Sequence, residues 1–168
     1  VVPSGVTSIE HGGFRGCDGL TSIEVPSGGT SIGDYAFLGC NGLTSIEIPS
    51  SVTSIGNEAF KGCNGLTSIE IPSGVTSIGN GAFEDCRGLT NIEIPSSVTS
   101  IGNEAFKGCN GLTSINVATD NSFYTSENGV LYDKNKTELI CVPGAMSGKF
   151  VVPSGVTSIG YGAFWGCS

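Results

Sequence analysis

Basic residues are scarce in this sequence, which has only seven Lys and Arg among 168 residues and a formal net charge of −8. The seven are scattered along the chain. Because phosphate binding needs clustered positive charge, the sequence argues against nucleic acid as a partner. The same shortage argues against an anionic membrane surface. No apolar run approaches the ~20 residues of a membrane-spanning helix, so we expect no membrane insertion.

Residues that carry common catalytic and metal chemistry are also missing or isolated. Histidine occurs once, as His11, so a His-dependent nucleophile arrangement would rest on a single residue in an irregular part of the chain. There is no Cys-x-x-Cys and no Cys/His cluster with zinc-ligand spacing. The glycines form no phosphate-binding loop between a strand and a helix. We therefore expect no enzymatic activity, no cofactor and no bound metal.

What the sequence does contain is a unit of 23 residues that recurs along nearly the whole chain. Phenylalanine and cysteine show the register most plainly, each recurring five times at that spacing: Phe14, Phe37, Phe60, Phe83 and Phe106, and Cys17, Cys40, Cys63, Cys86 and Cys109. Such a short period predicts a solenoid in which each coil contacts only its neighbours.

The period runs through residues 1–168 and predicts a single solenoid domain. We expect coils to start near residues 1, 25, 48, 71 and 94, an extended coil at 117–151, and a partial coil from residue 152. Neither end carries the polar cap of a terminal coil, so we expect a fragment of a longer array, and end-to-end self-association stays open.

Two strands per coil are predicted, because the segment [Val/Leu]-Thr-Ser-Ile, or a variant with one residue changed, occurs twice in each regular coil and favours extended backbone. The alternation after the second segment places Ile69 and Ile71 inside the coil and leaves Ser68 and Glu70 in solvent. Between the strands, residues 56–63 carry apolar side chains at the spacing of one helical face, which predicts a short helical turn. The expected fold class is an α/β solenoid, mostly β, with a parallel sheet and short second strands.

The cysteines are interpreted as buried free thiols. In-register stacking would hold equivalent Cβ atoms about 4.8 Å apart, beyond the ~3.5–4.5 Å that a disulfide prefers. Small buried thiols pack as hydrophobic groups. Cys141 differs, because it stands where an outward Glu is expected. If it is exposed, its thiol would be reactive or would pair with another chain.

The reiterated pattern Leu-x-x-Ile-x-Ile-Pro-x-x-Val-x-x-Ile-Gly-x-x-Ala-Phe-x-x-Cys resembles the BspA-like leucine-rich repeat family over practically all of residues 1–168. Its positions fall on Leu43, Ile46, Ile48, Pro49, Val52, Ile55, Gly56, Ala59, Phe60 and Cys63, and on their equivalents one period away. The resemblance implies a right-handed solenoid with a curved parallel sheet on its concave side. It also implies a surface or secreted protein of a host-associated bacterium or mucosal protozoan, linked to adhesion.

One candidate binding region is the extended coil, where a strand, a turn and a second strand over residues 129–142 predict a β-hairpin. Such extended coils also resemble the family, so an ordinary variant coil with Leu131 and Ile140 in the core is one interpretation. The functional interpretation is that aromatic and basic side chains form a protein-binding anchor. The candidates are Phe123, Tyr124, Tyr132, Lys134 and Lys136.

A second candidate is a row of carboxylates, one per coil, at the same outward strand position. The row consists of Glu24, Glu47, Glu70 and Glu93, flanked by Ser45, Ser68 and Asn91. A solvated face that discourages aggregation explains such a row without a partner. The alternatives are a basic protein partner and, less favoured, weak Ca²⁺ binding.

The function best supported by the sequence is a protein-binding or adhesion module that recognises host or neighbouring-cell proteins through many weak, equivalent contacts. A structural spacer or an intracellular scaffold without a ligand of its own is the alternative. The expected location, cell surface or secreted, rests on the family resemblance.

Overall fold

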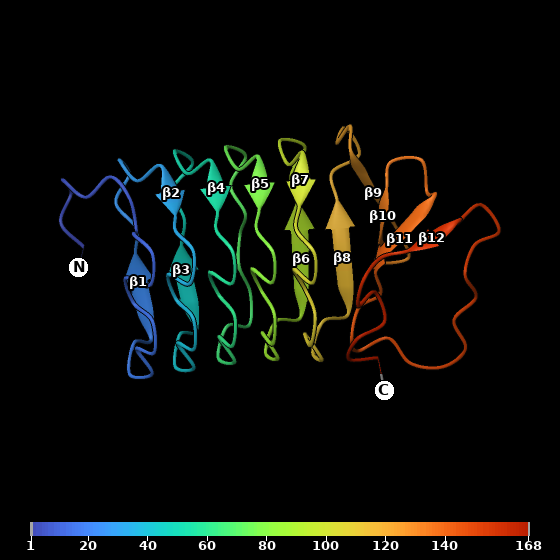
Figure 1. The fold of residues 1–168 in the computed structure, drawn as a ribbon. Helices are drawn as coiled ribbons and strands as arrows, with labels where there is room; N and C mark the ends of the chain where they lie inside the picture. Colours follow the sequence, from blue (N-terminus) through green and yellow to red (C-terminus); the bar gives the residue numbers. More distant parts are fainter. Residues whose placement is uncertain (1, 168) are drawn as a thin grey trace.

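A computed structural model describes residues 2–167, which form a solenoid whose coils stand side by side from the N-terminus to the C-terminus (Figure 1). We number the coils by the sequence period: coil 1 ends at residue 24, coils 2 to 5 cover residues 25–116, the extended coil covers 117–151, and the last coil follows. The strands are β1 (Ser22–Glu24), β2 (Ser31–Ile32), β3 (Ser45–Glu47), β4 (Ser54–Ile55), β5 (Ser77–Ile78), β6 (Asn91–Ile94), β7 (Ser100–Ile101), β8 (Ser114–Val117), β9 (Tyr124–Glu127), β10 (Val130–Asp133), β11 (Glu138–Cys141) and β12 (Ser158–Ile159).

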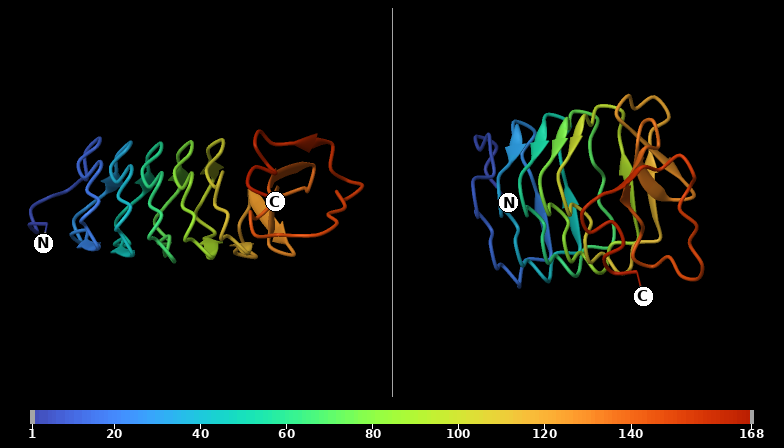
Figure 2. Two further views of the ribbon diagram at one scale, coloured as in Figure 1. Left: turned by 90° about the horizontal axis from the view of Figure 1, so that it is seen from below. Right: turned by 45° about the vertical axis from the view of Figure 1, so that its right-hand side comes forward.

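Parallel, in-register pairing joins equivalent residues of neighbouring coils on two sides of the solenoid (Figure 2). On one side β2, β4, β5 and β7 form a four-stranded sheet in which Ile32 pairs with Ile55, and Ile55 with Ile78. On the other side β1 pairs with β3, and β6 with β8. The predicted pair of strands is therefore present in coils 2, 4 and 5, whereas coil 1 has only β1 and coil 3 only β4. The spacing of 23 residues sets the register on both sides.

The core is a set of ladders that run along the solenoid axis. Phe37, Phe60 and Phe83 are completely buried, and their rings stack nearly parallel, with centroids 5.2 and 5.4 Å apart. Beside them, each buried Cys thiol donates a hydrogen bond to a Phe carbonyl of the preceding coil, as from Cys63 to Phe37 at 3.2 Å. Each coil thus supplies one layer of a continuous apolar column.

The predicted helical turn over residues 56–63 is wrong: the segment is a run of tight turns. Glu58 and Gly62 both have positive φ, at 50° and 73°, which interrupts a right-handed helix. The N–H groups of Glu58 and Phe60 donate to the carbonyls of Asn80 and Ala82 in the next coil, each at 2.8 Å. The N–H groups of Lys61 and Cys63 donate within the turn instead, to the carbonyls of Glu58 and Phe60. Bonds to the next coil thus alternate with local turn bonds, and they offset the strain of the left-handed residue.

The predicted hairpin is present as the antiparallel pair β10–β11, and β9 adds a third strand that the sequence pattern did not indicate. The register shifts between Leu131 and Tyr132. As a result Leu131 and Leu139 are fully buried, whereas Ile140, which was expected in the core, is only partly buried. The last coil joins this sheet through β12, which pairs in parallel with β11.

Candidate functional site

One side of the solenoid carries the strand pairs β1–β3 and β6–β8, with residues 68–71 between them. We call the surface formed by the outward side chains of this side the Glu face. It consists of Ser22, Glu24, Ser45, Glu47, Ser68, Glu70, Asn91 and Glu93. Glu24 lies opposite Glu47, and Ser22 opposite Ser45, in the paired strands. All eight side chains are exposed. The structure therefore places every member of the predicted carboxylate row on one side of the solenoid.

A shallow groove crosses the Glu face where the parallel pairing is interrupted. Residues 68–71, at the junction of coils 3 and 4, belong to no strand, so β3 and β6 lie in separate two-stranded sheets. The groove, of about 700 Å³, is lined there by Ser45, Glu70 and Glu93 and continues to Thr119. The carboxylate-bearing residues Glu70 and Glu93 therefore border the groove.

The carboxylates of the Glu face differ from those on the turn side of the coils in their partners. On the turn side Lys61 bridges Glu58 and Glu84, with N···O distances of 3.3 and 3.0 Å. Lys107 bridges Glu84 and Glu104, at 3.3 and 3.0 Å. Within residues 2–167 no ion pair involves any of the four carboxylates of the Glu face, listed above as Glu24, Glu47, Glu70 and Glu93. The Glu face therefore keeps its negative charge uncompensated.

The aromatic and basic candidates of the extended coil do not form a joint surface. Among the aromatic candidates only Phe123 is well exposed, at 51%. Tyr132, expected at the surface, is 2% exposed, because β10 is packed between β9 and β11. Lys134 donates to the backbone carbonyl of Asn121, and Lys136 pairs with Glu127 at 3.2 Å. The interpretation of Tyr132 as a surface anchor is therefore wrong, and both lysines are engaged within the protein.

Tyr124 and Asn121 instead fix the extended coil to coil 5. The Tyr124 hydroxyl accepts a hydrogen bond from the Ile101 N–H at 2.9 Å. Asn121, a completely buried polar residue, donates to the carbonyls of Pro95 and Val98 at 2.9 and 3.0 Å. Sequence reasoning missed Asn121, because it lies in the polar run of residues 119–122 and no sequence signal distinguishes it from its neighbours.

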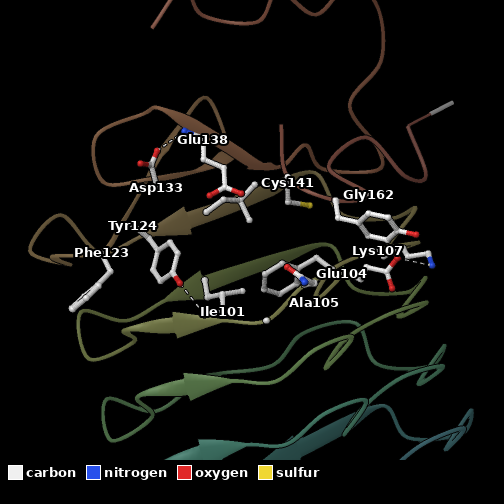
Figure 3. A pocket seen from close by; sticks show the side chains of 16 residues that line it. Ile101, Glu104, Ala105, Lys107, Phe123, Tyr124, Asp133, Glu138, Cys141 and Gly162 are labelled. Atoms are coloured by element: carbon white, nitrogen blue, oxygen red, sulfur yellow. Dashed lines mark hydrogen bonds and ion pairs between the residues drawn. The ribbon is translucent and has the colours of Figure 1, made fainter. Parts of the chain in front are cut away.

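A cavity of about 320 Å³ lies between the turn of coil 5, the three-stranded extended coil and the turn of the last coil (Figure 3). Phe123 and Tyr124 line one side, and Tyr161 lies on the last coil. Glu104 and Glu138 also border it. The sequence analysis did not predict this cavity; the available signal was the absence of a Gly-x-x-Ala-Phe-x-x-Cys segment within residues 117–151.

The cysteines form no disulfide among the described residues, and Cys40, Cys63, Cys86 and Cys109 are buried. Burial raises the pKa of Cys63 and of Cys109 to about 12. Cys141 is half-buried, and burial raises its pKa to about 12 as well, so the expectation of a reactive thiol there is not supported. Among the described residues no group of three or more His, Cys, Asp or Glu side chains is placed to hold a metal ion.

The hairpin turn is held by Asp133. Its carboxylate accepts hydrogen bonds from the N–H groups of Thr137 and Glu138 and from the Thr137 hydroxyl, all at 2.7 Å. Burial by itself would raise the pKa of Asp133, but these donors lower it below its usual value.

A depressed pKa means that Asp133 stabilises the fold above its unfolded-state pKa of about 3.9, and that this contribution is lost as the pH falls through the folded-state value. We expect Asp133→Asn to lower the free energy of unfolding at pH 7 by about 1 kcal/mol. The same substitution should have much less effect at pH 2, which urea unfolding at the two pH values measures. An equal loss at both would contradict this role of the carboxylate.

No described residue belongs to a helix that is long and apolar enough to span a membrane.

Solved structures with the same fold come from several bacteria. A leucine-rich repeat protein from Eubacterium ventriosum is 35% identical and aligns over 86% of this chain and 45% of its own, with a TM-score of 0.72. One from Bacteroides ovatus is 32% identical over 92% of this chain and 40% of its own, with a TM-score of 0.67. The pneumococcal vaccine antigen PcpA is 24% identical, covers 86% and 42%, and has a TM-score of 0.67, which shows the fold alone. This chain thus spans less than half the length of each.

No curated protein sequence matches this chain. The family described as BspA type leucine-rich repeat region matches it in six copies, over residues 1–113 and 30–168. That match covers the chain from end to end, and it agrees with the ladders of Phe, Cys and Ile in the core. The chain belongs to the BspA-type leucine-rich repeat family.

Proposed function

We propose that this chain is a protein-binding, adhesion-type module of a surface or secreted protein, and that the Glu face is its contact surface. The partner is a host or neighbouring-cell protein that presents a basic patch. The observation that carries the proposal is the row of exposed carboxylates without cationic partners beside the groove. Membership of a leucine-rich repeat family, whose members are generally interaction or adhesion proteins, supports it.

The contrast between the two sides of the solenoid supports the choice of surface. Glu84 on the turn side is satisfied by two lysines and is 11% exposed at its side chain. The carboxylates of the Glu face repel one another along the axis, and a basic partner would relieve that repulsion. Because the same contact repeats once per coil, several weak contacts add up to retention through avidity.

The test is biolayer binding at physiological salt, with reductant, to an immobilised panel that includes fibronectin and fibrinogen. We expect saturable binding by the parent chain and about tenfold weaker binding by the triple variant E47Q/E70Q/E93Q, if each lost contact contributes about 0.5 kcal/mol. Raising the salt concentration should weaken the parent more than the variant.

A charge-matched variant, E10Q/D120N/E127Q, removes three negative charges from exposed positions outside the groove and serves as the control. We expect it to bind like the parent. Equal weakening by both triple variants would show that net charge alone governs binding and would refute the Glu face as the site. If the parent binds nothing in the panel, the structural spacer becomes the better account.

A further inference from the structure

The hydrogen bonding between coils stops at the turn of coil 5. In coil 3 the N–H groups of Glu58 and Phe60 donate to carbonyls of coil 4 at 2.8 Å. In coil 4 the equivalent residues, Gly81 and Phe83, donate to coil 5 at 2.9 and 2.8 Å. In coil 5 the equivalents are Glu104 and Phe106, and neither N–H donates to any acceptor within residues 2–167.

The cause is the extended coil, which replaces its turn with the hairpin and so offers no carbonyls at this position. The turn of the last coil comes close, since a Cβ on Gly162 would lie 3.8 Å from the Cγ of Glu104. However, the Ala163 carbonyl, which by register would face Phe106, accepts from the Val142 N–H at 2.8 Å instead. The backbone N–H groups of Glu104 and Phe106, two residues apart, therefore have no acceptor at the cavity.

The cavity bordered by these N–H groups is lined by aromatic side chains and by carboxylates. Glu104, Asp133 and Glu138 contribute three carboxylates, and Lys107 is the single cationic residue in the lining. Lys107 is already bound to Glu104 and Glu84, and Asp133 is bound to the hairpin turn. Glu138 is exposed and makes no ion pair within residues 2–167, so its carboxylate is available to a ligand (Figure 3).

We propose that this cavity binds a short segment of a basic peptide, which takes the place of the missing turn. Two carbonyls of the peptide accept from the N–H groups of Glu104 and Phe106, as the carbonyls of the next coil do elsewhere. An Arg or Lys side chain of the peptide pairs with Glu138, with Phe123 and Tyr161 flanking its stem. A volume of about 320 Å³ holds a few residues, at the small end of ligand pockets. The site is separate from the Glu face and does not depend on the function proposed for it.

The test uses ¹⁵N-labelled chain and two blocked tripeptides, acetyl-Ala-Arg-Ala-amide and acetyl-Ala-Glu-Ala-amide, followed by amide chemical shifts. We expect saturable shifts at the Glu104 and Phe106 amides with the Arg peptide, and at least about fivefold weaker binding of the Glu peptide. Absence of shifts at these two amides, shifts confined to the Glu face, or equal binding of the two peptides would each overturn the proposal.

Two single-charge variants assign the basic side chain to its partner. Glu138→Gln removes an exposed carboxylate from the cavity and should weaken binding of the Arg peptide about three- to fivefold. Glu70→Gln makes the same change on the Glu face and should leave that binding unaltered. Parent-like binding by Glu138→Gln would refute the assigned partner, and weakening by Glu70→Gln would move the site to the Glu face.

Discussion

Replacing Phe60 with alanine is expected to lower the free energy of unfolding by about 3–5 kcal/mol. Phe60 is completely buried, and its ring stacks on Phe37 on one side and on Phe83 on the other. Its removal leaves a hole in the middle of the aromatic column, where neighbouring rings are held by their own ladders and cannot collapse into the space. The midpoint of urea unfolding, with reductant present, measures the loss.

The matched control is Phe123→Ala, which truncates the same residue type at a position that is 51% exposed. We expect a change within about 0.5 kcal/mol, as for most surface substitutions. If Phe60→Ala were as mild as Phe123→Ala, the stacked aromatic column would not be a main source of stability.

The second large effect is expected for Gly79→Ala, at about 2–3 kcal/mol of destabilisation. A Cβ added to Gly79 would lie 2.5 Å from the backbone N of Asn57 and from the carbonyl carbon of Gly56 in the preceding coil. Both obstacles are backbone atoms, so the coils would have to move apart. The equivalent glycines in the neighbouring coils meet the same obstacle, with Cβ distances of 2.5 Å at Gly56 and 2.4 Å at Gly102.

Gly19→Ala provides the comparison, because a Cβ there meets no atom within 4 Å and φ is not positive. It should be neutral or slightly stabilising, through reduced entropy of the unfolded chain. Thermal unfolding of the two variants separates the explanations. A similar loss of stability in both would point to chain flexibility instead of contact between coils.

The regular part of the fold could be predicted from the sequence because one short period determines every contact in it. Once Phe60 faces inward, Phe37 and Phe83 must stack on it, and Glu24 must lie beside Glu47. The helical turn was predicted wrongly for a physical reason. The spacing of Ala59 and Cys63 fits a helix, but every second N–H group of this segment bonds to the next coil.

The cavity could not be predicted in the same way, because it arises where the repeat fails. A sequence pattern shows which residues are missing from the extended coil, but it does not show which N–H groups of coil 5 are thereby left free. Likewise Tyr132 is a residue type typical of interface anchors, but in the structure it is buried. The strand β9 that pairs beside it could not be predicted, because its sequence shows no strong apolar alternation. Of the two candidate binding regions, only the Glu face has the side-chain arrangement expected from the sequence.

Hydrogen–deuterium exchange of the chain bound to a protein from the matrix panel, compared with the free chain, shows which surface makes the contact. If the Glu face is the contact surface, we expect binding to slow exchange in the strands beneath it, at residues 22–24, 45–47 and 91–94. Slower exchange confined to residues 101–107 and 138–141, with the Glu face unchanged, would contradict it and would leave the cavity as the binding site.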